Sequence, residues 1–391
     1  MRNVEYLCRE NKSRIDMINN PFVLTPHVPE ALFCDREQET QTVIDYVNNG
    51  GNVTIISPRR LGKTGLIYHV FDRIKSCGMP FDCYYVDLYS SQSYEDFICL
   101  LTESVVNVLK RETKIKRFLN KLGSIRPVIT YDVVHDKLSA SMTFQNDQER
   151  SLTLKNILGY LNAHSVPVLI AIDEFQQVRE YEGVSMEAIL RTYIQPLDNV
   201  KFIFSGSKKH MMTEMFTSPR SPFYDSTHCL YLDKIPHDVY HQYIVEMFAK
   251  YNKSITKEAV DFILDWTKRH TLYTQTLCNV VFLLSRGKID VEQVYEAIRK
   301  ILQEREPGFI ESGKLLTKGQ WNYLKAIAKE GELKQPTATE FLKKHSIGTP
   351  ATSMRALHAL VDKELVLETT TLDGTSYSVY NVFLSRWLES I

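Results

Sequence analysis

One stretch, from Asn52 to Val70, constrains the fold of this chain more than any other. It opens with residues 53–56, a short run of apolar and β-branched residues that is typical of a buried strand. A tight loop follows, and apolar residues recur at helical spacing after Gly62-Lys63-Thr64. The order of strand, loop, Gly-Lys-Thr and helix predicts a phosphate-binding loop, or P-loop.

The residue types of this loop suit a nucleoside triphosphate. The first N–H groups of a helix are unpaired and lie at its positive end, so they bind phosphate oxygens. Gly62 lets the backbone approach the phosphates, Lys63 supplies a positive charge to the β- and γ-phosphates, and the Thr64 hydroxyl is expected to ligate Mg²⁺. The residues expected to contact the nucleotide are Ser57, Pro58, Arg59, Arg60, Leu61, Gly62, Lys63, Thr64 and Gly65. Ser57 stands where the usual pattern has Gly, which would be strained if the turn required a positive φ.

A second segment supplies carboxylates. The apolar run 166–172 ends in Asp173-Glu174, which fits a central parallel strand that delivers acids to the carboxyl edge of a sheet. This is a Walker B pattern, in which Asp173 would hold Mg²⁺ through water and Glu174 would act on the attacking water. A further apolar strand, 200–207, ends in small hydroxyl residues, Ser205 and Ser207. Either serine is a candidate for a position beside the γ-phosphate, or the two are an ordinary helix cap, and the sequence does not choose between them.

The remaining pattern predicts the architecture. Strands at 53–56, 81–88, 166–173 and 200–207 alternate with helices, which indicates an α/β parallel sheet of the kind found in ATPases with an extra central strand. Residues 110–145 are less regular and include a possible hairpin at 125–142. From 236 to 305 only helices are expected, at 236–251, 256–268, 272–286 and 290–304. They form either a lid over the nucleotide or a bundle that packs only against its neighbours.

The last block predicts a winged helix-turn-helix. Capping boxes are expected at Thr317–Gln320 and Thr337–Glu340, with helices at 318–330, 337–345 and from Pro350 to Lys363. Two strands then flank a turn at Asp373-Gly374. The third helix is expected to present four polar side chains outward, those of Thr352, Ser353, Arg355 and His358.

Charge and cysteine content limit the possible partners. The chain has 47 basic and 47 acidic residues, so its overall charge favours neither nucleic acid nor an anionic membrane. Residues 311–391 hold ten Lys/Arg and nine Asp/Glu, a net charge of +1, which favours protein docking or autoinhibition over DNA binding. Seven scattered cysteines without a CxxC pair indicate a reducing compartment. Without an apolar signal or spanning segment, we expect a soluble cytoplasmic protein with no membrane contact.

Several segments together resemble a known group of proteins. Residues 33–37 are similar to an "F-x-G-R-E" box, 57–64 to a "G-P-R-R-x-G-K-T" loop, 169–175 to a Walker B strand, 202–207 to an "F-I-F-S-G-S" strand, and 380–388 to a "D-P-x-F-x-x-W-L" ending. The chain therefore resembles the prokaryotic P-loop ATPases of the archaeal-ATPase type, in the signal-transducing (STAND) branch related to AAA+ proteins and replication initiators.

The resemblance implies a role for individual residues. Lys63 would bind phosphate, Thr64 and Asp173 would hold Mg²⁺, Glu174 would be the catalytic base, and Arg36 of the box would be a nucleotide-binding residue. The departures from the family pattern are Ser57 and Asp35 in place of Gly, Asn381 in place of Asp, and the absence of a Pro in residues 269–273, where the lid helix begins.

The sequence thus predicts an ATPase switch with three parts. They are a P-loop domain at 1–235, including an N-terminal arm at 1–30, a helical lid at 236–308 and a winged helix domain at 309–391. ATP, ADP and Mg²⁺ are the expected ligands, turnover is expected to be slow, and the winged domain is expected to bind a protein partner or a second copy. Two alternatives remain open: a DNA-binding regulator or initiator-like protein whose affinity ATP controls, and a scaffold locked by nucleotide that does not hydrolyse it. The loop residue Arg220 either reaches a γ-phosphate or is solvated.

Overall fold

The computed structural model describes residues 20–109, 111–122, 125, 127–132, 137–371 and 374–391. The chain divides into two compact units: one comprises Thr25–Lys234, and the other joins the segment that ends at Leu24 to Ile235–Ile391. The expected N-terminal arm falls largely on residues 1–19, which lie outside the described residues.

The first unit is built on a parallel five-stranded sheet in the order β2-β5-β6-β1-β7. Its strands are β1 (Val53–Ile56), β2 (Asp82–Asp87), β5 (Val168–Asp173), β6 (Val200–Gly206) and β7 (His228–Tyr231). Strand β6 lies between the P-loop strand and the Walker B strand, which confirms the extra central strand. The edge strand β7 was not predicted, because it is short and carries no clear alternation of buried residues.

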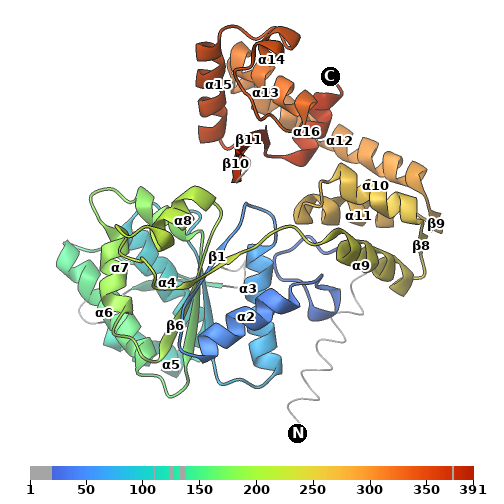
Figure 1. The fold of residues 1–391 in the computed structure, drawn as a ribbon. Helices are drawn as coiled ribbons and strands as arrows, with labels where there is room; N and C mark the ends of the chain where they lie inside the picture. The colour runs from blue at the N-terminus through green and yellow to red at the C-terminus, as the bar shows by residue number, and fades with distance from the viewer. Residues whose placement is uncertain (1–19, 110, 123–124, 126, 133–136, 372–373) are drawn as a thin grey trace. The chain divides into compact units, whose positions relative to one another are not determined.

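Helices cover both faces of this sheet (Figure 1). They are α2 (Glu37–Asn48), α3 (Lys63–Ser76), α4 (Tyr94–Leu109), α5 (Glu112–Lys121), α6 (Asp147–Asn162), α7 (Met186–Ile194) and α8 (Lys209–Thr217), with the 3-10 helices η1 (Glu30–Leu32) and η2 (Phe175–Glu180). Along β5, Leu169 and Ala171 join a core with α2 and α3, whereas Val168, Ile170 and Ile172 join the core on the other face. All six residues of β5 are buried, as the unbroken apolar run predicts.

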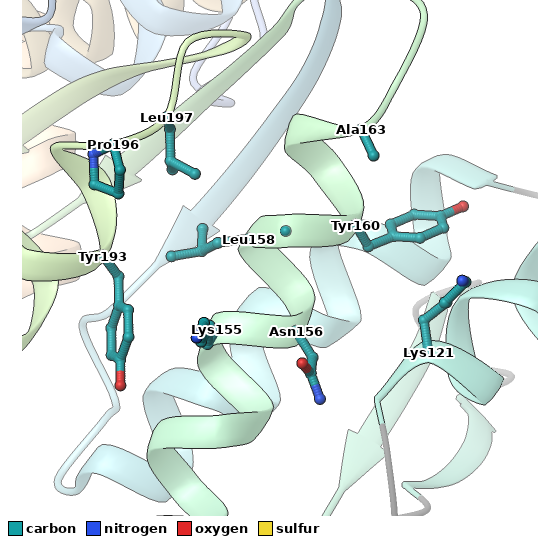
Figure 2. A pocket seen from close by; sticks show the side chains of 10 residues that line it. Lys121, Lys155, Asn156, Leu158, Tyr160, Ala163, Tyr193, Pro196 and Leu197 are labelled. Carbon is teal, nitrogen blue, oxygen red and sulfur yellow. The ribbon is translucent and has the colours of Figure 1, made fainter.

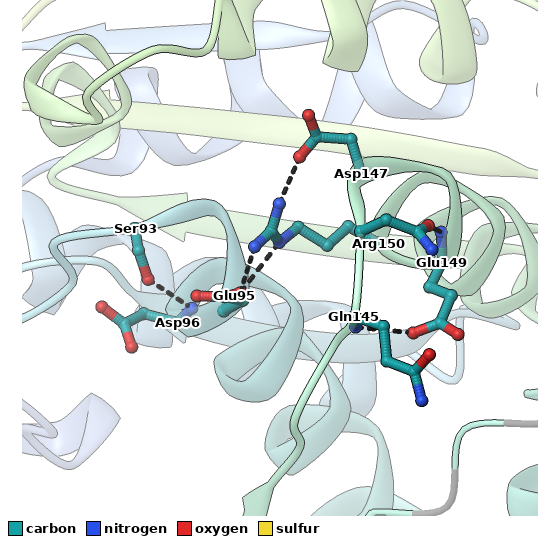
Figure 3. Close-up of polar contacts among 8 residues, drawn as sticks. Ser93, Glu95, Asp96, Gln145, Asp147, Glu149 and Arg150 are labelled. Carbon is teal, nitrogen blue, oxygen red and sulfur yellow. Dashed lines mark hydrogen bonds and ion pairs between the residues drawn. The ribbon is translucent and has the colours of Figure 1, made fainter.

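The irregular segment between α4 and α6 contains the predicted hairpin, formed by antiparallel β3 (Val128–Asp132) and β4 (Lys137–Ser141). Side chains of α4 fix it in place, because the Asn107 amide exchanges two hydrogen bonds with the backbone of Leu138, at 2.8 and 2.9 Å. Arg150 of α6 reaches Glu95 of α4 at 2.5 Å and joins these two helices (Figure 3). Helix α5, which no prediction anticipated, buries Phe118 in the same core.

In the second unit, four helices occur where they were predicted: α9 (His237–Lys250), α10 (Lys257–Trp266), α11 (Thr271–Leu284) and α12 (Val291–Lys314). Two short parallel strands, β8 (Ser254–Ile255) and β9 (Lys288–Ile289), link their connections. Helix α12 continues ten residues beyond its predicted end, so the predicted boundary at 308/309 lies inside it. The segment before Leu24 is anchored in this unit by the fully buried Phe22, whose ring centre lies 4.9 Å from that of Phe248.

The winged part consists of α13 (Lys318–Glu330), α14 (Thr339–Lys344), α15 (Pro350–Asp362), β10 (Val366–Thr371), β11 (Gly374–Val379) and α16 (Val382–Glu389). The Thr317–Gln320 capping box is confirmed. The Thr337–Glu340 box is wrong, because α14 is capped by Ala338 without a side-chain bond. Of the predicted turn, Asp373 lies outside the described residues. No helix in the described ranges is long and apolar enough to span a bilayer.

One predicted surface residue is buried instead. Thr352, Arg355 and His358 are exposed on α15, but Ser353 is fully buried and its hydroxyl donates to the Pro336 carbonyl at 2.7 Å. It faces the core because it lies four residues before Leu357, which places both on the same side of the helix.

Candidate nucleotide-binding site

The P-loop connects the carboxyl end of β1 to the first turn of α3, as predicted. Two of its residues adopt positive φ, Arg60 at 68° and Gly62 at 102°, and Gly62 is the residue that precedes the helix. Ser57 is not among them, so the serine in place of the usual glycine causes no backbone strain of this kind. Ser57 and Leu61 are buried, Pro58, Arg59, Thr64 and Gly65 are partly exposed, and Arg60 is exposed.

The Lys63 ammonium is buried within the loop that it belongs to. It donates to the carbonyl oxygens of Ser57 at 3.0 Å and Pro58 at 3.4 Å. Burial lowers the pKa of Lys63, while the nearby carboxylates of Glu174 and Asp173 act in the opposite direction. The ammonium is therefore a desolvated cation, held by two neutral carbonyl oxygens, which a phosphate oxygen can replace.

Asp173 is the most heavily hydrogen-bonded group of the site and is only 3% exposed. Its Oδ2 accepts from Thr64 at 2.6 Å and from the Tyr85 phenol at 2.9 Å. Its Oδ1 accepts from the Ser205 hydroxyl and from the Glu174 backbone N–H. Thr64 of the P-loop and Asp173 at the end of the Walker B strand, 109 residues apart, thus meet as predicted, although β6 separates the two strands.

Glu174 has a different set of partners. Its Oε2 accepts from Ser207 at 2.6 Å and from the Gln176 amide at 2.5 Å. Ser207 also accepts from Arg59 of the P-loop at 3.3 Å. The two serines that the sequence could not separate therefore serve different acids, Ser205 contacting Asp173 and Ser207 contacting Glu174.

Tyr85 and Gln176 were missed by sequence reasoning. Tyr85 is on β2, which joins the site only through its pairing with β5. Gln176 belongs to η2, where no motif marks it, and its Oε1 is buried without a hydrogen-bond partner. A polar residue three positions after the Walker B aspartate was the one available signal for Gln176.

Arg36 of the box before α2 is buried and adopts φ of 78°, next to Asp35 at 60°. Its guanidinium binds Glu39 at 2.6 Å and the Asp233 carbonyl at 2.5 Å. The positive φ of Asp35 explains why the related box has glycine there, and Asp tolerates this region better than most residues. Arg220 is exposed on its loop.

The donor set fits a hard cation. The Thr64 hydroxyl and the Asp173 carboxylate present oxygen atoms to one point at the start of α3, and Mg²⁺ prefers oxygen ligands and binds alongside phosphates. Within the described ranges, no cluster of three or more His, Cys, Asp or Glu residues offers a competing metal site.

Residues 308–390 match the model of a family described as "Probable winged helix domain". A search of curated proteins found no match. Among solved structures, the chain is similar to the Walker-type ATPase PABY2304 of Pyrococcus abyssi, with 16% identity, a TM-score of 0.64, and 94% of this chain and 99% of that chain covered.

It is also similar to two Aeropyrum pernix proteins. These are ORC2 in its ADPNP–ADP complexes (14% identity, TM-score 0.59, 95% of each chain covered) and ORC1 in complex with DNA (13% identity, TM-score 0.52, 95% of this chain and 96% of that chain covered). These matches concern the fold. The chain has the fold of a P-loop ATPase, a parallel α/β sheet followed by helices, with a winged helix domain at its carboxyl end.

Proposed function

We propose that this protein binds Mg²⁺·ATP at the P-loop and hydrolyses it slowly as a regulatory switch. The observation that carries the proposal is the meeting of a buried ammonium, a threonine hydroxyl and two adjacent carboxylates at the carboxyl end of a parallel sheet. Ligands of α/β folds bind at this edge. The similarity in fold to a Walker-type ATPase and to a protein bound to ADPNP and ADP is consistent with it.

Each residue then has a role. Lys63 and the N–H groups at the start of α3 neutralise and orient the phosphates. Thr64 and Asp173 would hold Mg²⁺, which offsets the negative charge that develops on the phosphate oxygens. Glu174 would accept a proton from the attacking water. Ser207 and Gln176 both donate to its Oε2, and these two hydrogen bonds would hold the carboxylate in a fixed orientation.

We propose that the second unit transmits the nucleotide state of the P-loop to a partner. Arg386 of α16 donates to the Trp266 carbonyl of α10 at 3.0 Å, and Trp387 donates to Glu306 of α12 at 3.2 Å. These contacts favour movement of the winged helix together with the helical bundle when the nucleotide state changes.

We propose that residues 1–235, 236–308 and 309–391 are the functional segments of the chain. We also propose a cytoplasmic site of action and a protein partner or second copy at the winged helix. Free thiols at Cys34, Cys77, Cys83, Cys99 and Cys229 suit a reducing compartment.

Calorimetry and phosphate release together test the proposal. Lys63→Ala should abolish ATP binding in the presence of Mg²⁺. Glu174→Gln should bind ATP but release no phosphate, and Lys75→Ala, on the exposed end of α3, should behave as wild type. If the wild type takes up no nucleotide, the proposal is wrong. If it binds ATP and never releases phosphate, the chain is instead a scaffold locked by nucleotide.

A second candidate function is DNA binding under nucleotide control. It is favoured by the winged helix match, by the exposed Thr352, Arg355 and His358 on α15, and by the likeness in fold to a protein crystallised with DNA. Gel shifts with random duplex over a salt series decide it. A DNA affinity that falls steeply as the salt concentration rises supports this function, and the absence of binding at low salt rules it out.

A further inference from the structure

A second cleft opens in the first unit, far from the P-loop edge of the sheet. Its volume is about 450 Å³, within the range of small-molecule sites. Its lining includes Ala163, which precedes β5, and Leu197, which precedes β6. The cleft therefore lies at the amino ends of these strands, whereas the P-loop site lies at their carboxyl ends.

Three elements contribute its walls (Figure 2). Tyr193 and Leu197 come from α7 and the loop after it, Lys155 projects from α6 in the middle, and Lys121 comes from α5 on the other side. Ten described residues line the cleft, and none of them carries a carboxylate. The chemistry offered is thus apolar and aromatic surface with two ammonium groups and the amide of Asn156, whose Nδ2 also donates to the Leu122 carbonyl at 3.3 Å.

Helix α5, which lines the cleft through Lys121, is strongly basic in a chain of zero net charge. Helix α5 carries four basic residues and one acidic residue in ten positions, a net charge of +3. Glu112 forms an ion pair with Lys116 at 2.5 Å, which leaves Lys114, Arg117 and Lys121 as the excess. Such a concentration of cations beside a cleft attracts anions.

One aromatic wall is rigid. The Tyr160 ring lies 4.9 Å from those of both Phe118 and His164, so it is held from two sides. Burial raises the pKa of Tyr160 above its ordinary value, and the charge of Arg117 acts in the opposite direction. Tyr160 and the Lys121 ammonium thus both line this side of the cleft.

We propose that this cleft binds a nucleotide unit, a planar ring that carries a phosphate, at a site separate from the P-loop. The ring would stack on Tyr193 against the apolar surface of Leu158 and Leu197, the phosphate would lie between Lys121 and Lys155, and Asn156 would bond to the edge of the ring. Cations that follow a phosphate and aromatic side chains that stack on a base are the features by which proteins bind single nucleotides and single strands. The same chemistry serves a free nucleotide and one base of a single-stranded nucleic acid, and the experiment separates these sources.

The test uses the full chain with Lys63→Ala, so that the P-loop does not contribute. AMP is followed by calorimetry, and a fluorescein-labelled 12-nucleotide oligo-dT by anisotropy, at 50 and 200 mM NaCl. We expect Lys121→Ala with Lys155→Ala to weaken binding at least tenfold and to flatten the salt dependence, and Tyr193→Ala to weaken it about 5- to 100-fold. Tyr193→Phe, which keeps the ring and the packing, should bind as the parent does.

The two probes distinguish the two sources of the ligand. Binding of AMP identifies a free nucleotide as the ligand, and binding of oligo-dT alone identifies a single strand. The matched control changes Lys75 and Lys343, which are exposed elsewhere, to Ala and should have no effect. The proposal is overturned if neither probe binds at 50 mM NaCl, if the control pair and the cleft pair weaken binding equally, or if a polyglutamate peptide of equal charge competes as well as the probes. None of these results bears on ATP binding at the P-loop.

Discussion

The phenol of Tyr85 offers the sharpest test of how the candidate site is held together. It is one of four donors to the buried Asp173 carboxylate, at 2.9 Å from Oδ2. Removing one partner of a hydrogen bond to a charged group costs about 1.5–3 kcal/mol. Because three donors remain, we expect Tyr85→Phe to lower the free energy of unfolding by about 1.5 kcal/mol, which is about 3–6 °C in Tm for a unit of this size.

The pH dependence of this cost follows from the phenol. Burial, and next the charge of Asp173, raise the pKa of Tyr85 far above its ordinary value of 10.0. The folded state therefore keeps the phenolic proton where the unfolded chain loses it, so its stabilising effect is complete below pH 10 and is lost progressively above it. The difference between wild type and Tyr85→Phe should be constant from pH 6 to 9 and shrink above pH 10.

Urea unfolding followed by circular dichroism measures the effect, with Tyr84→Phe as the matched control. Tyr84 is the neighbour of Tyr85 on β2, and its ring is buried in the core on the other face of the sheet. If Tyr85→Phe and Tyr84→Phe unfold at the same urea concentration as the wild type, the bond to Asp173 contributes nothing and the reasoning is refuted. A Tyr85→Phe variant should also bind Mg²⁺·ATP several-fold more weakly, while binding in EDTA is unchanged.

Three further changes probe other parts of the chain. A Cβ at Gly206 would clash with the Gln176 amide oxygen. Gly206→Ala should therefore destabilise the first unit by about 1–3 kcal/mol in thermal melts and slow phosphate release. An unchanged melting temperature would show that the neighbouring side chains move aside at no cost. The hydrogen bond from His345 lowers the pKa of Glu330 from its ordinary value of 4.5, so Glu330→Gln should reduce stability above pH 4.5. The difference in stability between this variant and the wild type should vanish on acidification, which urea titrations at pH 3 and 7 would reveal. Arg386→Ala removes two hydrogen bonds to carbonyl oxygens at the end of α10 and should lower the unfolding midpoint measured by tryptophan fluorescence. Arg386→Lys should recover little of this loss, because lysine lacks the planar guanidinium. Full recovery by lysine would argue for charge rather than geometry.

Much of the architecture was predictable because it is encoded locally. The strands of the sheet, except β7, could be predicted from short apolar runs, and the helices of the bundle from apolar residues at helical spacing. The hairpin at β3 and β4 was predicted, but α5 beside it was not, although Ile115, Phe118 and Leu119 repeat at helical spacing. The false capping box at Thr337 shows the limit of such signals, because a matching pair of residues does not decide where a helix begins.

In the candidate site too, residues that are close together in the chain were predictable and contacts between distant segments were not. Gly62, Lys63 and Thr64 are consecutive, so their placement at the start of α3 follows from the chain itself. The two acids could be assigned to a strand end for the same reason. The partners of these acids could not, because Tyr85 and Ser205 reach Asp173 from two separate strands.

The sequence by itself determined the order of the elements, the phosphate-binding loop and the acids at the end of β5, since these depend on residues close together in the chain. Only the tertiary structure decided that Ser205 contacts Asp173 while Ser207 contacts Glu174, and that Tyr85 completes the donors to Asp173. The physical reason is that strand register sets which side chains of distant segments become neighbours, and register is fixed by the packing of the whole sheet rather than by any one strand.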